Sequence, residues 1–182
     1  MDVWKSLHDG DHRLGRQVSS SPSEGARRLL PAVEEAAEHT KLWWGAAVLM
    51  ASAGGRRGRR AAVTGVVSMG VAQTVSNGLV KHMWRRRRPP EEWISQEEVR
   101  ERPDSSSFPS GHTAAAVGFT AAVAAVWPWA GMACAVPTAL VAYERVHSGA
   151  HYPSDVVAGA LIGLAASVPA CRAPRLVRRV LL

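Results

Sequence analysis

Five stretches of mostly apolar residues alternate with charged or proline-containing segments along the chain. They cover residues 42–55, 61–80, 112–127, 129–143 and 154–170. Residues 61–80 also contain several weakly polar side chains, which is typical of a helix buried against other helices. We therefore expect an all-α protein, a polytopic membrane helix bundle of about five transmembrane helices, with the 61–80 helix at its centre.

Two local features indicate how the last three helices are arranged. Pro128 separates two apolar runs, which predicts a helical hairpin over residues 112–127 and 129–143. Gly159 and Gly163 lie four residues apart in the final apolar stretch, so one face of that helix carries small residues. Such a face predicts close packing against a neighbouring helix.

Polar segments divide the chain into a segment of residues 1–41, an apolar domain of residues 42–171 and a basic tail of residues 172–182 at the water interface. We expect residues 1–23 to be loosely ordered. Residues 23–41 predict one or two amphipathic helices, interrupted near Pro31, that lie at a membrane surface or pack on the domain. Residues 85–107 predict a charged loop with a short helix around 91–100.

The net charge is +7, from 22 Lys+Arg against 15 Asp+Glu. The arginines cluster in residues 56–60, in residues 85–88 and near the C-terminus, and each cluster flanks an apolar run. This layout is typical of a membrane protein and not of a nucleic-acid-binding arm. Cys134 and Cys171 lie in or at the end of apolar stretches, so we interpret them as packing residues.

Three short motifs carry candidate chemistry. In chain order they are Lys81-x6-Arg88-Pro89, Pro109-Ser110-Gly111-His112 and Arg145-x5-His151-x3-Asp155. Arginine and lysine bind anions, and histidine can act as a nucleophile or proton carrier near neutral pH. If the apolar runs cross a membrane in turn, all three motifs reach the same face.

These motifs resemble those of the type 2 phosphatidic acid phosphatase superfamily, which includes lipid phosphate phosphatases, bacterial polyprenyl pyrophosphate phosphatases, soluble acid phosphatases and vanadium haloperoxidases. The resemblance covers roughly residues 61–171, and three ordered motifs with matching spacing are a strong signal. One departure is Glu144, which stands where the family usually has serine. It puts one contact beside Arg145 in doubt.

Phosphoryl oxygens need fixed donors. Lys81, Arg88 and Arg145 are expected to supply charge, while Ser110 and the Gly111 amide add hydrogen bonds at a helix N-terminus. The resemblance implies that His151 attacks phosphorus, that Asp155 accepts a hydrogen bond from its other ring nitrogen, and that His112 transfers the proton. We expect no metal and no cofactor.

Of the remaining basic residues, Arg85, Arg86 and Arg87 are interpreted as attracting anionic lipid or polyphosphate. His147 is a candidate pocket residue. The other histidines are expected to face solvent: His8, His12, His39 and His82.

The leading hypothesis is a multi-pass enzyme of a bacterial inner membrane that hydrolyses a lipid phosphate or pyrophosphate. A polyprenyl-linked substrate is favoured by the small size of the chain, with a decaprenyl-linked phosphoribose phosphate as one candidate. Alternatives are a phosphatidylglycerol phosphate or phosphatidate phosphatase, a vanadium haloperoxidase and a non-catalytic scaffold. The basic turn and tail favour an external active site, whereas a polar N-terminal segment without a signal peptide favours an internal one.

Overall fold

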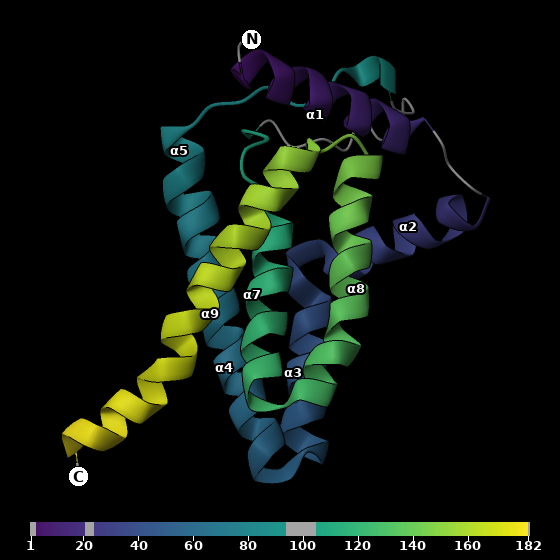
Figure 1. The fold of residues 1–182 in the computed structure, drawn as a ribbon. Helices are drawn as coiled ribbons and strands as arrows, with labels where there is room; N and C mark the ends of the chain where they lie inside the picture. Colours follow the sequence, from purple (N-terminus) through teal and green to yellow (C-terminus); the bar gives the residue numbers. More distant parts are fainter. Residues whose placement is uncertain (1–2, 21–23, 94–104, 182) are drawn as a thin grey trace.

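The computed structural model describes residues 3–20, 24–93 and 105–181. Every regular element in these ranges is a helix, which confirms the predicted all-α class. The long helices run side by side as a bundle, and the N-terminal helix lies across one end of it (Figure 1).

Five helices build the bundle. They are α3 (Lys41–Ala53), α4 (Gly55–Gln73), α7 (Gly111–Val126), α8 (Pro128–His147) and α9 (Pro153–Leu181). The predicted break at Pro128 is confirmed, because α7 ends just before it and α8 begins there. The helix α4 continues through a π-helical stretch, Thr74–Val80, into the short helix α5 (Lys81–Met83).

The helix at the centre of the bundle is α7, which contacts α4, α8 and α9. The predicted central position of residues 61–80 is met only in part: α4 contacts α3, α7 and α9, but it leaves Val63 and Val67 exposed. Side-chain size explains the position of α7: alanines and Gly118 dominate this helix, so three neighbours can approach its backbone. Larger side chains fill the space toward α3, where the Trp43 and Phe119 ring centroids lie 5.5 Å apart.

The predicted small-residue face of α9 is confirmed. A methyl group on Gly159 would clash with the carbonyl oxygen of Ser110, and one on Gly163 would lie 2.6 Å from that of Ala114. Both carbonyls belong to the beginning of α7. The two glycines thus set how closely α9 approaches the segment that carries the second motif.

We expect Gly159→Ala to lower the free energy of unfolding by about 1–3 kcal/mol, because the added methyl group meets backbone that cannot rotate away. Gly70→Ala is the matched control, since nothing lies within 4 Å of a methyl group there and alanine is the better helix former. Thermal unfolding of both purified variants measures the difference. Equal stability of the two variants would contradict the close packing.

The N-terminal region differs from expectation. Residues 1–23 were predicted to be loosely ordered, but α1 (Val3–Ser19) is a helix, and the Ser19 hydroxyl donates to the carbonyl of Val146 at 3.0 Å. The contacts that hold α1 are mostly polar, which is why the hydrophobic pattern does not indicate them.

The helix α2 (Glu24–Ala37) passes through Pro31 without the predicted interruption. It packs against α8 and buries Leu30 and Ala37, as expected of a helix packed on the domain, while Leu29 on its other side is exposed. A 3-10 turn, Glu38–Thr40, then leads into α3.

The basic segment at residues 56–60 lies in the first turns of α4, not in the turn itself. Gly55 makes the turn from α3 with a φ of 56°, a conformation that favours glycine. Arg57 Nε then donates to the carbonyl of Val126 at the end of α7, 3.0 Å away. The α3–α4 turn and the C-terminus lie at the end of the bundle opposite the N-terminus (Figure 1).

Two further elements differ from their predicted boundaries. The last helix was expected to end at residue 170, but α9 continues to Leu181 and includes most of the predicted tail. In the charged loop a 3-10 turn, Glu91–Trp93, is present. The remainder of the short helix predicted there lies outside the described residues.

By length and apolar composition, one helix segment of the described chain, Pro153–Arg172, could cross a membrane. Gly111–Val126 is a shorter apolar helix. The five crossings expected from the sequence stay a prediction.

Candidate active site

The three motifs meet at the end of the bundle that α1 covers. Lys81 ends the α4–α5 rod, His112 begins α7, Arg145 lies in the last turn of α8, and His151 follows in the loop to α9. His112 lies within Coulombic range of Lys81, Arg88, Arg145 and His151. The predicted convergence of the motifs is thus confirmed.

His151 is buried, and its ring is held by the chain that precedes the second motif. Gly149, with a φ of 60°, turns the chain after α8, and the His151 amide donates to the Arg145 carbonyl at 2.9 Å. The ring Nδ1 lies 2.6 Å from the carbonyl oxygen of Ser107. A carbonyl can only accept, so Nδ1 carries the proton and Nε2 carries the lone pair.

The predicted hydrogen bond between His151 and Asp155 is not formed. Asp155 Oδ2 lies 3.8 Å from Nδ1, and it accepts instead from the Tyr152 amide at 2.9 Å. Asp155 begins α9, where exposed amides attract a carboxylate. Its charge therefore faces His151, while the Ser107 carbonyl selects the tautomer.

The pKa of His151 is lowered to about 4, chiefly because burial disfavours the charged ring. Arg88 and Arg145 lower it further, and Asp155 opposes them. The imidazole is consequently neutral at pH 7, the form in which a histidine can act as a nucleophile.

The second motif forms the beginning of α7. The Ser110 side chain is buried and caps this helix, with its oxygen 2.9 Å from Thr113 Oγ1 and accepting from the Thr113 amide at 3.4 Å. The Ser110 amide donates to the Asp155 carbonyl at 3.0 Å. The Ser110 hydroxyl, which was predicted to bind phosphate, caps α7 in this structure. Gly111 lines the pocket, as expected of the amide-bearing residue at a helix N-terminus.

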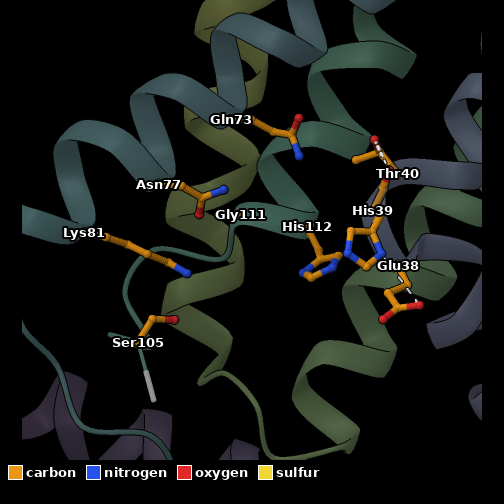
Figure 2. Close-up of a pocket in the computed structure, with 9 residues that line it drawn as sticks. All are labelled: Glu38, His39, Thr40, Gln73, Asn77, Lys81, Ser105, Gly111 and His112. Atoms are coloured by element: carbon orange, nitrogen blue, oxygen red, sulfur yellow. Dashed lines mark hydrogen bonds and ion pairs between the residues drawn. The ribbon is translucent and has the colours of Figure 1, made fainter. Parts of the chain in front are cut away.

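Arg88 forms hydrogen bonds to two loops of the site. Its Nη1 donates to the carbonyl of Ala150 at 2.6 Å, and its Nε donates to that of Ser105 at 3.2 Å. The guanidinium therefore lies directly beside the His151 loop. Lys81 points into the neighbouring pocket (Figure 2).

Arg145 is held by two carboxylates. It forms a short ion pair with Glu144 and a second one, 2.7 Å from Nη2 to Oε1, with Glu34 of α2. The other Glu144 oxygen, Oε1, is buried and has no hydrogen-bond partner among the described residues. The departure from the family's serine thus surrounds a predicted phosphate ligand with negative charge. A phosphate at Arg145 would compete with Glu34, whose side chain is 43% exposed.

A pocket of about 460 Å³ opens beside Lys81, Gly111 and His112. Gln73 and Asn77 continue the Lys81 face of the same rod, and the turn at Glu38–Thr40 forms the opposite wall (Figure 2). We did not predict these wall residues. Their signal was present in the sequence, because positions 73, 77 and 81 are polar at four-residue spacing within an apolar span.

Two other predictions about side chains were wrong. His12 was expected to face solvent, but its ring packs against Trp93 and Tyr152, with centroids 5.4 and 5.0 Å away. Arg86 was interpreted as a lipid-attracting residue, yet its Nη1 lies 2.7 Å from Asp155 Oδ1. A run of four arginines gives no indication of which one turns inward.

His147 does not appear among the residues that line this pocket, although it is buried. Among the described residues, no group of three or more His, Cys, Asp or Glu side chains is arranged to hold a metal ion.

A helical bundle with these three motifs at one end defines a class of protein. The profile of the PAP2 superfamily matches residues 61–178, which contain all three motifs, and the chain belongs to that superfamily.

Particular relatives are known from sequence and from structure. Lipid A 1-phosphatases of Rhizobium etli and Rhizobium johnstonii are each 47% identical to this chain over 60 residues, 31% of its length. That match spans only about a quarter of each relative, 25% and 23%.

Two solved structures share the fold. A transmembrane PAP2-type phosphatidylglycerolphosphate phosphatase from Bacillus subtilis has a TM-score of 0.70 at 17% identity, covering 93% of this chain and 87% of that one. LpxE from Aquifex aeolicus has a TM-score of 0.67 at 20% identity, covering 88% of this chain and 93% of its own.

Proposed function

We propose that this protein is a membrane-embedded phosphatase that hydrolyses a phosphomonoester or pyrophosphate of a lipid through a phosphohistidine on His151. The observation that carries the proposal is the Ser107 carbonyl 2.6 Å from Nδ1 of a buried His151. It leaves the lone pair on Nε2, and the charges of Arg88 and Arg145 act on the same ring. Membership of the PAP2 superfamily supports the same chemistry.

In the first step His151 Nε2 forms a bond to phosphorus while the bond to the leaving oxygen breaks. His112, which enters this step protonated in the substrate complex, donates its proton to that oxygen, and Asp155 stabilises the positive charge that develops on the His151 ring. In the second step His112 takes a proton from water as the water oxygen attacks phosphorus, and the bond to Nε2 breaks. The first step releases the lipid alcohol from a phosphomonoester, or the lipid monophosphate from a pyrophosphate. The second step releases inorganic phosphate and leaves His112 protonated and His151 neutral, as at the start.

The phosphoryl oxygens are held by Lys81, Arg88, Arg145 and the Gly111 amide in this proposal. Fixed positive charges neutralise the oxygens so that a neutral imidazole can approach. Ser110 contributes by capping α7, which aims the amides of the first turn at the anion.

The membrane setting is supported by the relatives, one of which is described as transmembrane, and by the apolar segment Pro153–Arg172. We propose a multi-pass protein of a bacterial inner membrane. In this arrangement the five bundle helices cross the bilayer and the active site lies at the face covered by α1.

For the lipid we propose a polyprenyl-linked phosphate. The polar walls beside His112 leave room for a hydroxylated or second phosphorylated group next to the scissile phosphate. A decaprenyl-linked phosphoribose phosphate is one such substrate. A phosphatidylglycerol phosphate or phosphatidate substrate is the second candidate, favoured by the fold shared with the Bacillus subtilis enzyme.

Phosphate release by the purified protein from polyprenyl phosphates, polyprenyl pyrophosphates, phosphatidylglycerol phosphate, phosphatidate and lipid A tests the proposal. Vanadate should inhibit the reaction. If kcat/KM is highest on a glycerolipid, that lipid takes the place of the polyprenyl phosphate in the proposal. If the vanadate-loaded protein oxidises halide and releases no phosphate, it is a haloperoxidase. Absence of phosphate release from every ester would overturn the function.

We expect activity to survive excess EDTA with less than a twofold change, because side-chain cations supply the charge that a metal ion would otherwise provide. Phosphate release before and after chelation and dialysis measures this. Loss of activity that magnesium restores would mean that the proposed electrostatics are incomplete.

A further inference from the structure

Arg86 connects the N-terminal helix to the carboxylate beside His151. Its Nη1 lies 2.7 Å from Asp155 Oδ1 and donates to the Ser154 hydroxyl at 2.7 Å, while its Nη2 lies 2.6 Å from Asp11 Oδ2. The guanidinium also covers the Tyr152 ring, 4.2 Å from its centroid. The contacts to Tyr152, Ser154 and Asp155 lie within the third motif, and the contact to Asp11 joins them to α1.

Asp11 in turn holds the first turn of α9. Its Oδ1 accepts from the Ser154 amide at 2.9 Å, and its Oδ2 accepts from the Ser154 hydroxyl at 2.6 Å. Helix N-termini leave amides without partners within the helix, and here the partner comes from a residue 143 positions earlier in the chain. The Asp11 side chain is 6% exposed, so this carboxylate is committed to the contact.

Ring packing fixes α1 next to this ion-pair network. His12 contacts Trp93 edge-on and lies against Tyr152, and Trp93 meets Tyr152 at 90°. A methyl group on Gly15 would lie 3.1 Å from the Trp93 ring, so α1 and the 3-10 turn are in close contact. The helix is thus bound to the site by both charge and packing.

We propose that Asp11 and Arg86 are positioning residues, through which α1 fixes Asp155 and the beginning of α9 for the attack by His151. This inference rests on the proposed phosphohistidine chemistry. Asp155 would otherwise be free to swing toward His151 Nδ1, 3.8 Å away, and compete with the Ser107 carbonyl for its proton. Arg86 holds one carboxylate oxygen while the Tyr152 amide holds the other, so both are oriented.

The charges in the network alternate, with Arg86 between the carboxylates of Asp11 and Asp155. Burial works against the charge of Arg86, but the bonds to these two carboxylates outweigh it and raise its pKa. Arg86 thereby offsets part of the Asp155 charge. Asp155 raises the pKa of His151, whereas Arg88 and Arg145, which face His151 from the other elements, lower it.

Arg86→Gln should lower kcat roughly ten- to a hundredfold with little change in KM, the scale expected of a misplaced reacting group. Arg87→Gln is the matched control, because the Arg87 side chain is exposed and one position away. For Asp11→Asn the control is Asp9→Asn on the exposed side of α1. Arg86→Lys, which keeps the charge but not the forked geometry, should recover only part of the loss.

The pH profile separates positioning from a merely structural role. Without Arg86, the Asp155 charge acts on His151 unopposed, so the acid limb of kcat/KM should move to higher pH in Arg86→Gln. Without the Asp11 charge, Arg86 offsets Asp155 more strongly, so the limb should move to lower pH in Asp11→Asn. The double variant should show non-additive losses in kcat.

An Arg86→Gln variant with kcat and pH profile like those of Arg87→Gln would overturn the inference while the proposed function stands. If that variant does not fold, Arg86→Lys and Asp11→Asn decide. Wild-type kcat in both variants, or an acid limb in Asp11→Asn that stays in place or moves to higher pH, overturns the inference. A wild type that releases no phosphate from any ester overturns the function, and the positioning role with it.

Discussion

Replacing His151 by alanine should abolish phosphate release, with kcat reduced by about four orders of magnitude or more. The change removes the atom proposed to form the bond to phosphorus, whereas the proposed phosphate ligands Lys81, Arg88 and Arg145 remain. Substrate affinity should therefore change little. Phosphate release and equilibrium binding of the lipid phosphate, measured on the same purified variant, test both statements.

His82→Ala provides the control for this experiment. His82 is exposed and lies next to Lys81, a proposed phosphate ligand, so the substitution removes an imidazole from the same end of the bundle without changing the pocket. It should retain wild-type kcat. Substantial turnover by a folded His151→Ala protein would remove His151 from the role of nucleophile.

The loss of activity in His112→Ala should depend on the leaving group of the substrate. A lipid alkoxide leaves poorly without a proton, so loss of the general acid should lower kcat for the lipid substrate by about 10²–10⁴-fold. An aryl phosphate has a leaving oxygen that departs with little need of a proton, and its phosphorylation step should be affected much less. His112→Ala should then still form an acid-labile, base-stable phosphoenzyme with the aryl ester, while His151→Ala forms none.

His39→Ala is the comparison for His112, because both histidines line the same pocket (Figure 2) and the His39 side chain is largely exposed. We expect it to change KM more than kcat and to treat both leaving groups alike. An adduct on His112, or equal sensitivity of His112→Ala to the lipid and the aryl ester, would reverse or remove the assigned roles.

Glu144 distinguishes this chain from the usual pattern of its family. The Glu144 and Glu34 carboxylates both meet Arg145, a residue proposed to hold phosphate. In the proposed reaction, phosphate replaces the Glu34 contact while Glu144 stays beside the guanidinium. The two acidic residues lie 110 positions apart in sequence and belong to different helices, so nothing in the local pattern of either helix indicated their shared partner.

The sequence alone determined the features that depend on short-range spacing. Three ordered motifs indicated the family by resemblance, because their residues and internal spacing match its pattern. Pro128 fixed the α7–α8 break, and the four-residue spacing of Gly159 and Gly163 indicated the close helix contact. The alternation of apolar runs also determined that the motifs would share one end of the bundle.

Tertiary structure alone decided which groups hold the site residues in place. The partner of His151 Nδ1 is a backbone carbonyl, that of Ser107, and every residue has a carbonyl, so side-chain types cannot indicate it. The partners of Asp155 and of the first turn of α9 include Arg86 and Asp11. Arg86 comes from a run of charges, and Asp11 is a polar residue among the apolar positions of the amphipathic helix α1. Such contacts depend on where distant segments meet after packing, and a one-dimensional pattern of hydrophobicity carries no information about that meeting.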